Sequence, residues 1–513
     1  MLFNSHVFMF LFLPITISIF YLIAKFKSKV MAVSWLASMS LVFYAWWNPK
    51  FLILLFASIG FNYTVGYALV YIKKQHYNII RPIHILVLGI VVNLSTLAYY
   101  KYFNFFIANI NSLLNLSTPV ENIILPIGIS FFTFTQIAFL VDVYRGFVKE
   151  YKFISYVLFV TFFPHLIAGP ILHHKEMMPQ FEDEQNLNVD WENIALGTAI
   201  FVFGLFKKVI IADNLATFAT PVFNAVSQGA IPNLFEAWSG ALAYSLQLYF
   251  DFSGYSDMAV GLALLFNIRL PVNFFSPYKA TSIIEFWRRW HMTLSRYLKD
   301  YLYIPLGGNR YGEYKRLRNL MITMLLGGVW HGAGWTFIIW GSLHGLYLVI
   351  NHSWRKLNFS IPNSVAWGLT FISVVIAWVF FRADTAHSAV LIIKGMFGLN
   401  GISLPAKIAY KLPMLENYGV KFSGLMPLTN LSTSKVIISV GISMCIVIFL
   451  PNVMEITAKY RPALGIEKKS IETKLVKYIQ WKPSYLWSIV LGFMAIISIL
   501  AMVQASEFLY FQF

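Results

Sequence analysis

Long apolar runs separated by short polar stretches dominate the chain. They cover about residues 7–24, 31–48, 51–72, 83–103, 123–141, 154–172, 194–212, 236–266, 320–350, 365–382, 435–451 and 485–506. Most approach the roughly 20 residues that a helix needs to cross the hydrocarbon of a bilayer. Because some runs must be re-entrant or lie flat, we expect an all-α integral membrane protein with roughly ten to twelve transmembrane helices.

Composition points the same way. Hydrophobic residues make up 58% of the chain and charged residues 12%, against roughly a quarter charged in an ordinary soluble domain. No polar interruption has enough alternating apolar sequence to form a domain of its own, and no internal repeat of fixed period is present. We therefore expect one membrane-embedded domain over 1–513, with an interfacial or re-entrant cytoplasmic segment at 267–319 and the last helix in 485–513.

Lysines orient the predicted helices, because short loops rich in Lys and Arg stay in the cytoplasm. Lys25, Lys27 and Lys29 follow the first apolar run instead of preceding it, so we expect a retained helix rather than a cleaved signal peptide, with the N-terminus outside. The last apolar run is preceded by a second group, Lys468, Lys469, Lys474, Lys477 and Lys482. This group places the C-terminus outside as well.

The formal net charge of +17 raises the question of nucleic acid binding. No basic stripe with interleaved aromatics stands on a soluble domain, so we expect no nucleic acid partner. Membrane topology and anionic membrane lipid account for most of the charge. The single cysteine, Cys445, leaves no disulfide framework or thiol metal site and is expected in core packing.

The segment from 285 to 300 combines helical spacing with basic residues. Trp287, His291 and Ser295 fall on one face at i, i+4 and i+8, which predicts a continuous helix at the inner membrane surface. Its plain interpretation is an interfacial anchor. The alternative is a cytoplasmic phosphate site that suits coenzyme A, formed by Arg288, Arg289, Arg296, Lys299 and Arg310 with Lys315, Arg316 and Arg318.

A glycine pair in Leu306-Gly-Gly-Asn-Arg310 adds to this second interpretation. The amides of Gly307 and Gly308 could approach an anion closely. Two glycines alone are a weak signal.

His331 is the most informative single residue, since it stands in a nearly apolar stretch among Gly327, Gly328, Gly332 and Gly334. An ionisable group at membrane depth is a functional candidate. One interpretation is a hydrogen-bonded histidine with glycines as small helix contacts. The other is a neutral imidazole that accepts a proton from a hydroxyl, with the glycines leaving an open approach to the ring.

Other polar residues are weighed against His331. We favour packing or support for His344, because its separation from His331 does not resemble metal-ligand spacing, and we expect no metal. Asp251 and Asp257 could act as paired acid and base, but their spacing sets them on opposite sides of a helix. Structural ion pairs or cap bonds are the favoured interpretation.

Several sequence blocks carry a resemblance to a known family. They are Glu285-Phe-Trp-Arg-Arg-Trp-His-Met-Thr-Leu-Ser295, Asp300-Tyr-Leu-Tyr-Ile-Pro-Leu-Gly-Gly-Asn-Arg310, Gly327-Gly-Val-Trp-His-Gly332, Phe163-Pro-His-Leu-Ile-Ala-Gly-Pro170, Gly204-Leu-Phe-Lys-Lys-Val-Ile-Ile-Ala-Asp213 and Tyr249-Phe-Asp-Phe-Ser-Gly-Tyr-Ser-Asp257. Together they resemble the membrane-bound O-acyltransferases, and within them the branch of alginate and peptidoglycan O-acetyltransferases. In one departure, relatives often have Glu where this chain has Val272, which puts a carboxylate role there in doubt.

The resemblance implies a ring of helices around a thinned centre, with His331 as the catalytic histidine and His291 as the second motif histidine. The acyl donor would be acetyl-CoA, with no permanently bound cofactor. The ending Phe508-Leu-Tyr-Phe-Gln-Phe513 fits a Phe-x-Tyr-x-x-Phe pattern of this branch, which makes Tyr510 a candidate acyl relay. A tyrosine of the outer aromatic belt would occupy the same place.

The resemblance further implies a multi-pass protein of the bacterial inner membrane that passes acetyl to an extracytoplasmic, esterase-like acetyltransferase partner. The acceptor would be a polysaccharide, with an alginate-like exopolysaccharide favoured over peptidoglycan. A transporter of an acylated carrier predicts polar residues spread along a path instead of gathered around two histidines. A purely structural subunit leaves His331 unexplained.

Overall fold

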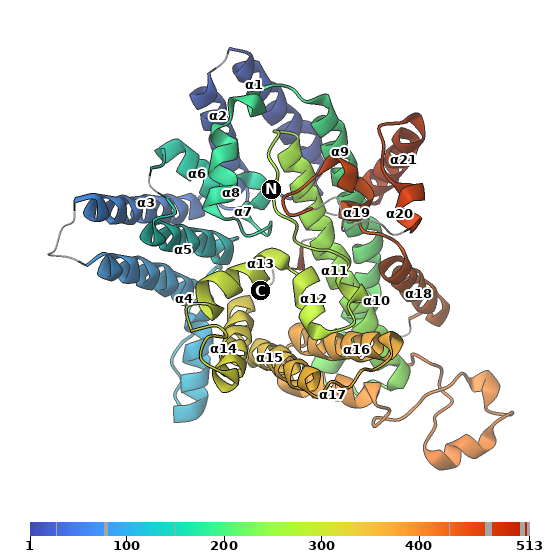
Figure 1. The fold of residues 1–513 in the computed structure, drawn as a ribbon. Coiled ribbons are helices and arrows are strands. Elements are labelled where there is room, and N and C mark those ends of the chain that lie inside the picture. The colour runs from blue at the N-terminus through green and yellow to red at the C-terminus, as the bar shows by residue number, and fades with distance from the viewer. Residues whose placement is uncertain are drawn as a thin grey trace. The chain divides into compact units, whose positions relative to one another are not determined.

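The protein is all-helical in the residues that the computed structural model describes, 1–26, 28–75, 81–148, 150–429, 431–466, 474–502 and 508–509 (Figure 1). β pairing within these ranges is limited to two isolated bridges, Pro271 with Leu464 and Ser403 with Lys421. The predicted fold class is therefore confirmed.

Within the described part of the chain, five helical stretches are long and apolar enough to cross a membrane by length and composition. They are Phe8–Lys25, Phe51–Gln75, Pro82–Leu114, Trp191–Ser227 and Asn363–Arg382. The pair Thr433–Phe449 and Val453–Tyr460, bent by 44°, makes a sixth if counted as one span. The ring and the larger number of spans stay predictions.

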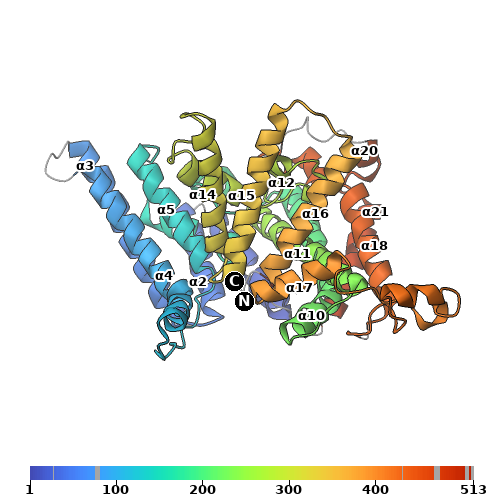
Figure 2. The same ribbon diagram turned by 90° about the horizontal axis from the view of Figure 1, so that it is seen from below.

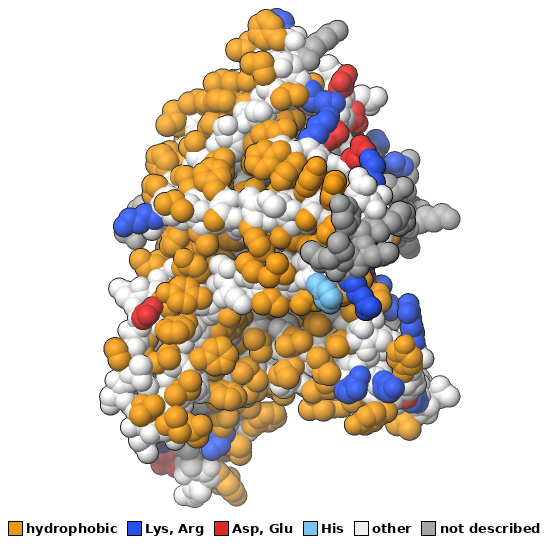
Figure 3. All heavy atoms as spheres, turned by 90° about the vertical axis from the view of Figure 1, so that its left-hand side faces the viewer, with side chains coloured by type: hydrophobic (Ala, Val, Ile, Leu, Met, Phe, Trp, Pro, Cys, Tyr) orange, Lys and Arg blue, Asp and Glu red, His pale blue; other side chains and the backbone are white. Residues whose placement is uncertain are grey.

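The outer faces of α3 (Phe51–Gln75) and α4 (Pro82–Leu114) expose large apolar side chains, among them Ile53, Phe56 and Leu88. Figure 3 shows hydrophobic side chains over most of this side of the molecule. Such a broad apolar surface fits contact with lipid. Cys445 is also exposed, so the expectation that it packs in the core is wrong: α18 turns that position outward.

Contacts along the chain divide it into two compact units. Unit 1 contains residues Met1–Leu205, Tyr255–Asn273 and the described residues from Val453 onward. Its helices are η1 (Phe8–Phe12), α1 (Leu13–Lys25), α2 (Lys29–Ala45), α3, α4, α5 (Ile129–Arg145), α6 (Phe153–Thr161), α7 (Phe163–Leu166), α8 (His174–Glu182), η2 (Glu184–Leu187), α9 (Trp191–Phe206), α19 (Val453–Thr457), η8 (Ala458–Tyr460), α20 (Lys474–Ile479) and α21 (Tyr485–Ala501). The expectation of a single domain over the whole chain stays a prediction.

Unit 2 contains Phe206–Gly254 and Phe274–Asn452, and it carries both motif histidines. Its helices are η3 (Lys207–Ala212), α10 (Asp213–Ser227), α11 (Leu234–Leu264, which passes into unit 1 after Gly254), η4 (Pro277–Lys279), α12 (Ile283–Arg289), α13 (Met292–Leu298), η5 (Lys299–Tyr303), α14 (Glu313–His331), α15 (Trp335–Lys356), α16 (Asn363–Arg382), α17 (Ala386–Met396), η6 (Ala406–Ile408), η7 (Pro413–Tyr418) and α18 (Thr433–Phe449).

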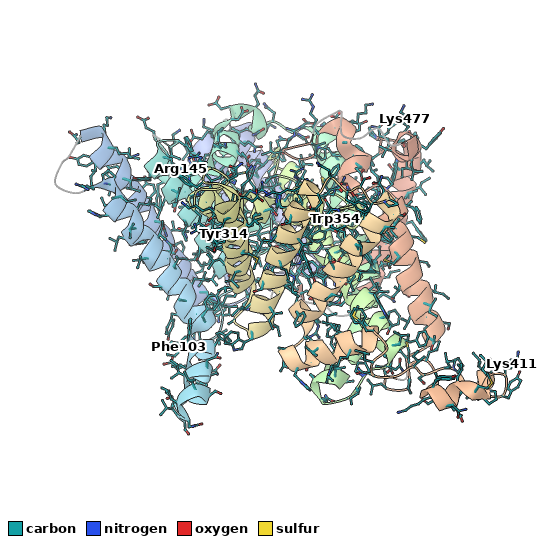
Figure 4. The ribbon with its side chains drawn as sticks, turned by 60° about the horizontal axis from the view of Figure 1, so that its bottom comes forward. Phe103, Arg145, Tyr314, Trp354, Lys411 and Lys477 are labelled. Carbon is teal, nitrogen blue, oxygen red and sulfur yellow. The ribbon has the colours of Figure 1, made fainter. Side chains whose placement is uncertain are left out.

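The apolar run predicted at 320–350 is two helices rather than one span. α14 ends at His331, and α15 begins at Trp335 after a short turn that contains Gly332 and Gly334. The two helices lie side by side (Figure 2). Tyr314, near the start of α14, and Trp354, near the end of α15, lie toward the same end of this hairpin (Figure 4). His331 therefore stands at the opposite end, beside the turn.

The continuous helix predicted over 285–300 is also wrong. α12 ends at Arg289 and α13 begins at Met292, because His291 adopts a left-handed backbone with φ 41° and ψ 54°. Trp290, just before it, is buried with its ring 5.6 Å from that of Phe286. Because the helix is interrupted between Arg289 and Met292, residues on the two sides of the interruption do not share a helix face as the i, i+4 spacing predicts.

Candidate active site

His331 is enclosed by aromatic rings of unit 2. It is the last residue of α14 and is 5% exposed. Its ring centroid lies 4.9 Å from Trp330, 4.9 Å from Trp340 at 84°, and 5.2 Å from Phe381 at 75°. These tilted and edge-on contacts are the favourable geometry for aromatic pairs. They hold the imidazole in an apolar, water-poor environment.

The neighbouring glycines act as helix contacts. A Cβ at Gly328 would lie 2.4 Å from the Phe337 carbonyl oxygen and 3.0 Å from the Gly341 Cα. A Cβ at Gly332 would lie 2.1 Å from the Phe337 ring. These glycines let α14 and α15 approach closely, as small residues do in membrane helices. Gly328 and Gly332 are thus small helix contacts, as the first interpretation predicts, and an open approach to the His331 ring stays a prediction.

His291 belongs to the same aromatic cluster. It is 1% exposed at the break between α12 and α13, outside the five candidate spans. Its ring lies 4.8 Å from Phe252 at 87° and 6.4 Å from Trp330. Burial lowers the pKa of His291 to about 3, so its imidazole is neutral at pH 7. Since Trp330 adjoins both histidines, the fold gathers the two motif histidines around one indole.

His344 lies behind this cluster and is fully buried. Its Nδ1 accepts a hydrogen bond of 3.2 Å from Trp287 Nε1, so the ring proton is on Nε2. The His344 ring is 4.8 Å from Trp340, which in turn borders His331. Sequence reasoning missed Trp340, although its i, i+4 spacing to His344 was a usable signal.

The predicted basic residues differ in their exposure and in whether a carboxylate of the same helix already binds them. Arg288, Lys299 and Arg310 are exposed, whereas Arg289 is half-buried and donates from Nε and Nη2 to Glu285 Oε1 at 3.1 and 2.8 Å. Burial by itself would raise the pKa of Glu285, but its bonds to Thr281 and Arg289 outweigh burial and lower the pKa below its ordinary value. Arg289 is thus committed to a carboxylate of its own helix.

The remaining predicted cations lie in similar settings. Arg296 on α13 is half-buried, and Lys315 and Arg318 near the start of α14 are exposed. Arg316 is paired with Glu313, three residues before it on the same helix. The exposed members therefore remain the better candidates for an anionic donor.

The glycine pair of the following loop forms turns. The amides of Gly307 and Gly308 donate to the carbonyls of Ile304 and Tyr303. Buried Asn319 on α14 donates from Nδ2 to the Leu306 and Gly308 carbonyls at 3.1 and 3.0 Å. Since the two amides are used inside the loop, the expectation that they approach an anion is wrong.

Asp251 forms an ion pair with buried Lys208 at 2.7 Å, which confirms the favoured structural interpretation of this carboxylate. Tyr510 lies outside the described residues. Phe508, two positions earlier, is buried against Tyr255 of unit 1 with ring centroids 4.4 Å apart. Among the residues that the structure describes, no group of three or more His, Cys, Asp or Glu could hold a metal ion.

Comparisons with known proteins place the cluster in a family context. The family model described as MBOAT, membrane-bound O-acyltransferase family, matches residues 9–383, which include both histidines. A peptidoglycan O-acetyltransferase of Helicobacter pylori is 48% identical over 79% of this chain and 81% of its own length. A probable alginate O-acetylase AlgI of Pseudomonas aeruginosa is 44% identical over 77% of this chain and 75% of its own.

A more distant relative is a teichoic acid D-alanyltransferase of Streptococcus thermophilus, 30% identical over 45% of this chain and 57% of its own length. The family model and the two longer matches each cover most of the chain, and the residues of the family model include the helices that carry the aromatic cluster. The chain therefore belongs to the membrane-bound O-acyltransferase family, and it is an acyltransferase.

Proposed function

We propose that this protein is an inner-membrane O-acetyltransferase that takes acetyl from cytoplasmic acetyl-CoA and passes it across the membrane for O-acetylation of an extracytoplasmic glycan. The observation that carries the proposal is the pair of buried histidines, His291 and His331, joined through Trp330. Both termini lie outside in this proposal, as the lysine pattern predicts. The exposed cations Arg288, Lys299 and Arg310 bind the phosphates of the donor.

In the proposed chemistry, a hydroxyl attacks the carbonyl carbon of the thioester. His331 accepts the hydroxyl proton as the C–O bond forms, and the C–S bond then breaks. The thiolate leaves and takes up that proton, which regenerates neutral His331 and yields coenzyme A. His291, also neutral, orients the thioester by hydrogen bonding. The dry aromatic walls strengthen these polar interactions.

The attacking hydroxyl is that of Tyr510 in the relay form of the proposal. Its acetyl ester is then attacked by a hydroxyl of an extracytoplasmic, esterase-like acetyltransferase, which delivers acetyl to the polymer and restores the tyrosine. The similar identities to a peptidoglycan O-acetyltransferase and an alginate O-acetylase support a bacterial glycan acceptor of either kind. A cell lacking the gene is expected to lose alkali-labile acetyl from one of these two polymers, and that polymer identifies the acceptor.

The test uses the purified full chain in detergent or liposomes with labelled acetyl-CoA. Wild type is expected to release coenzyme A and to transfer acetyl, and His331→Ala is expected to lose at least about 100-fold in rate, the lower range for a general base. His387→Ala is the matched control, since His387 is an exposed histidine of unit 2 at the start of α17. Wild-type rates in a folded His331→Ala protein would refute the proposal.

A further inference from the structure

A cluster of three charged side chains lies where α10, η3 and α11 meet in unit 2; Lys208 and Asp251 are buried, and Asp213 is half-buried. Lys208 is 2% exposed, and its Nζ lies 2.8 Å from Asp213 Oδ1 and 2.7 Å from Asp251 Oδ1. Lys208 lies in the π-helical segment η3, and Asp213 caps the end of that segment five residues later, where its amide donates to the Lys208 carbonyl in the i to i+5 pattern of a π-helix. Lys208 lies in the candidate span Trp191–Ser227, where an ionisable side chain is costly to bury and is therefore a functional candidate.

The cluster is one residue away from the aromatic site. Asp251 precedes Phe252 on α11, and the Phe252 ring stands edge-on to His291, 4.8 Å away at 87°. Successive residues of a helix point about 100° apart, so Asp251 meets Lys208 while Phe252 meets His291. The position of this turn of α11 therefore determines one wall of the His291 site.

A second lysine holds the same turn. Lys207 Nζ lies 5.9 Å from the centroid of the Tyr249 ring and 3.5 Å from Ser253 Oγ. These contacts are longer and weaker than the ion pair. They nevertheless fall on both sides of Phe252, so η3 contacts α11 from residue 249 to residue 253.

We propose that Asp251 is a positioning residue for the reaction: through Lys208 it fixes the turn of α11 that presses Phe252 against His291. This inference rests on the role of His291 in the proposed function. Asp213 binds the same lysine from α10 and does not share the turn with Phe252. Its contribution is to neutralise Lys208.

The two carboxylates provide a matched pair of variants. The cluster has one cation and two anions, so Asp251→Asn and Asp213→Asn each leave Lys208 paired with one carboxylate, and both are expected to fold. Asp251→Asn is expected to lower kcat about 10- to 100-fold, the scale of an ångström-level misplacement, with the KM for acetyl-CoA changed less than about twofold. Asp213→Asn is expected to stay within about twofold in both constants.

Phe252→Leu completes the test, because it keeps all three charges and removes the ring. Alone it is expected to lower kcat without changing KM, and Asp251→Asn is expected to add little in that background. Equal effects of the two Asn variants, or a full Asp251→Asn effect in the Phe252→Leu background, would overturn the inference. If Asp251→Asn does not fold, Phe252→Leu with wild-type kcat overturns it alone. Full activity of His291→Asn would instead refute the proposed function.

Discussion

The close packing of α14 on α15 makes Gly328→Ala a direct test of how the aromatic rings around His331 are held in place. The added methyl carbon would lie 2.4 Å from the Phe337 carbonyl oxygen, and that atom is backbone. The helices would have to separate by about 1 Å to restore ordinary van der Waals contact, because neither a backbone carbonyl nor the facing Gly341 can rotate away. Such overpacking costs about 1–3 kcal/mol.

The same shift acts on the reaction. His331 lies three residues beyond Gly328 on α14, while Trp340 on α15 borders its ring at 4.9 Å. A displacement of about 1 Å between the helices would therefore misplace the imidazole, which we expect to lower kcat about 100-fold. Neighbouring Gly327 is the control, since its added carbon would meet only the flexible Leu298 side chain at 3.3 Å.

The assay is release of coenzyme A by purified protein, with thermal unfolding in the same detergent. Gly327→Ala is expected to remain near wild type in both measurements. Both substitutions raise helix propensity equally, so any difference between them reports packing. If Gly328→Ala matches Gly327→Ala in rate and in Tm, the close contact between α14 and α15 does not hold the rings around His331 in place.

Three further predictions concern residues around the cluster. Trp287→Phe leaves Nδ1 of buried His344 without its hydrogen-bond donor, so the free energy of unfolding should fall by about 1–3 kcal/mol and Tm should fall with it. The double variant with His344→Leu should recover part of that loss, and no recovery would contradict the assigned bond. In the unfolded chain His291 becomes protonated as the pH falls below about 6.5, whereas in the folded chain burial keeps it neutral down to about pH 3. The free energy of unfolding therefore falls by about 1.4 kcal/mol per pH unit across that window. In His291→Asn this part of the pH dependence of Tm should vanish. Asn319→Ala removes both side-chain bonds to the loop before α14 and should speed protease cleavage within residues 304–312, with unchanged cleavage arguing against that anchor.

Much of the architecture follows from local pattern. Apolar runs of membrane-spanning length predict helices, and the helices at 51–72, 83–103 and 365–382 lie inside observed ones. The motif residues His291 and His331 could also be named beforehand, because ionisable groups among apolar neighbours are rare enough to stand out. Membrane orientation follows from lysine placement and stays a prediction.

Other features depend on contacts between distant segments. Helical periodicity predicted that Trp287 and His291 share one face of a single helix. In the structure the helix is interrupted at His291, whose backbone is left-handed, and Trp287 donates a hydrogen bond to His344. Two of the glycines around His331, Gly328 and Gly332, are helix contacts, because Phe337 of α15 leaves no room there for a side chain. Neither the helix interruption at His291 nor the contact of Phe337 with those glycines can be recognised from the spacing of residues in the sequence.

Sequence alone thus determined that the chain is a helical membrane protein and singled out His291 and His331 as its candidate catalytic residues, because composition and motif are properties of single positions. Tertiary structure decided what surrounds them: Trp330 adjoining both rings, Trp340 and Phe381 against His331, and Phe252 against His291. Those neighbours come from four helices, and two of them, α11 with Phe252 and α16 with Phe381, are distant in sequence from the histidines that they contact. Close packing of the interior brings these rings together, since each fills a space that exists only when the chain is folded.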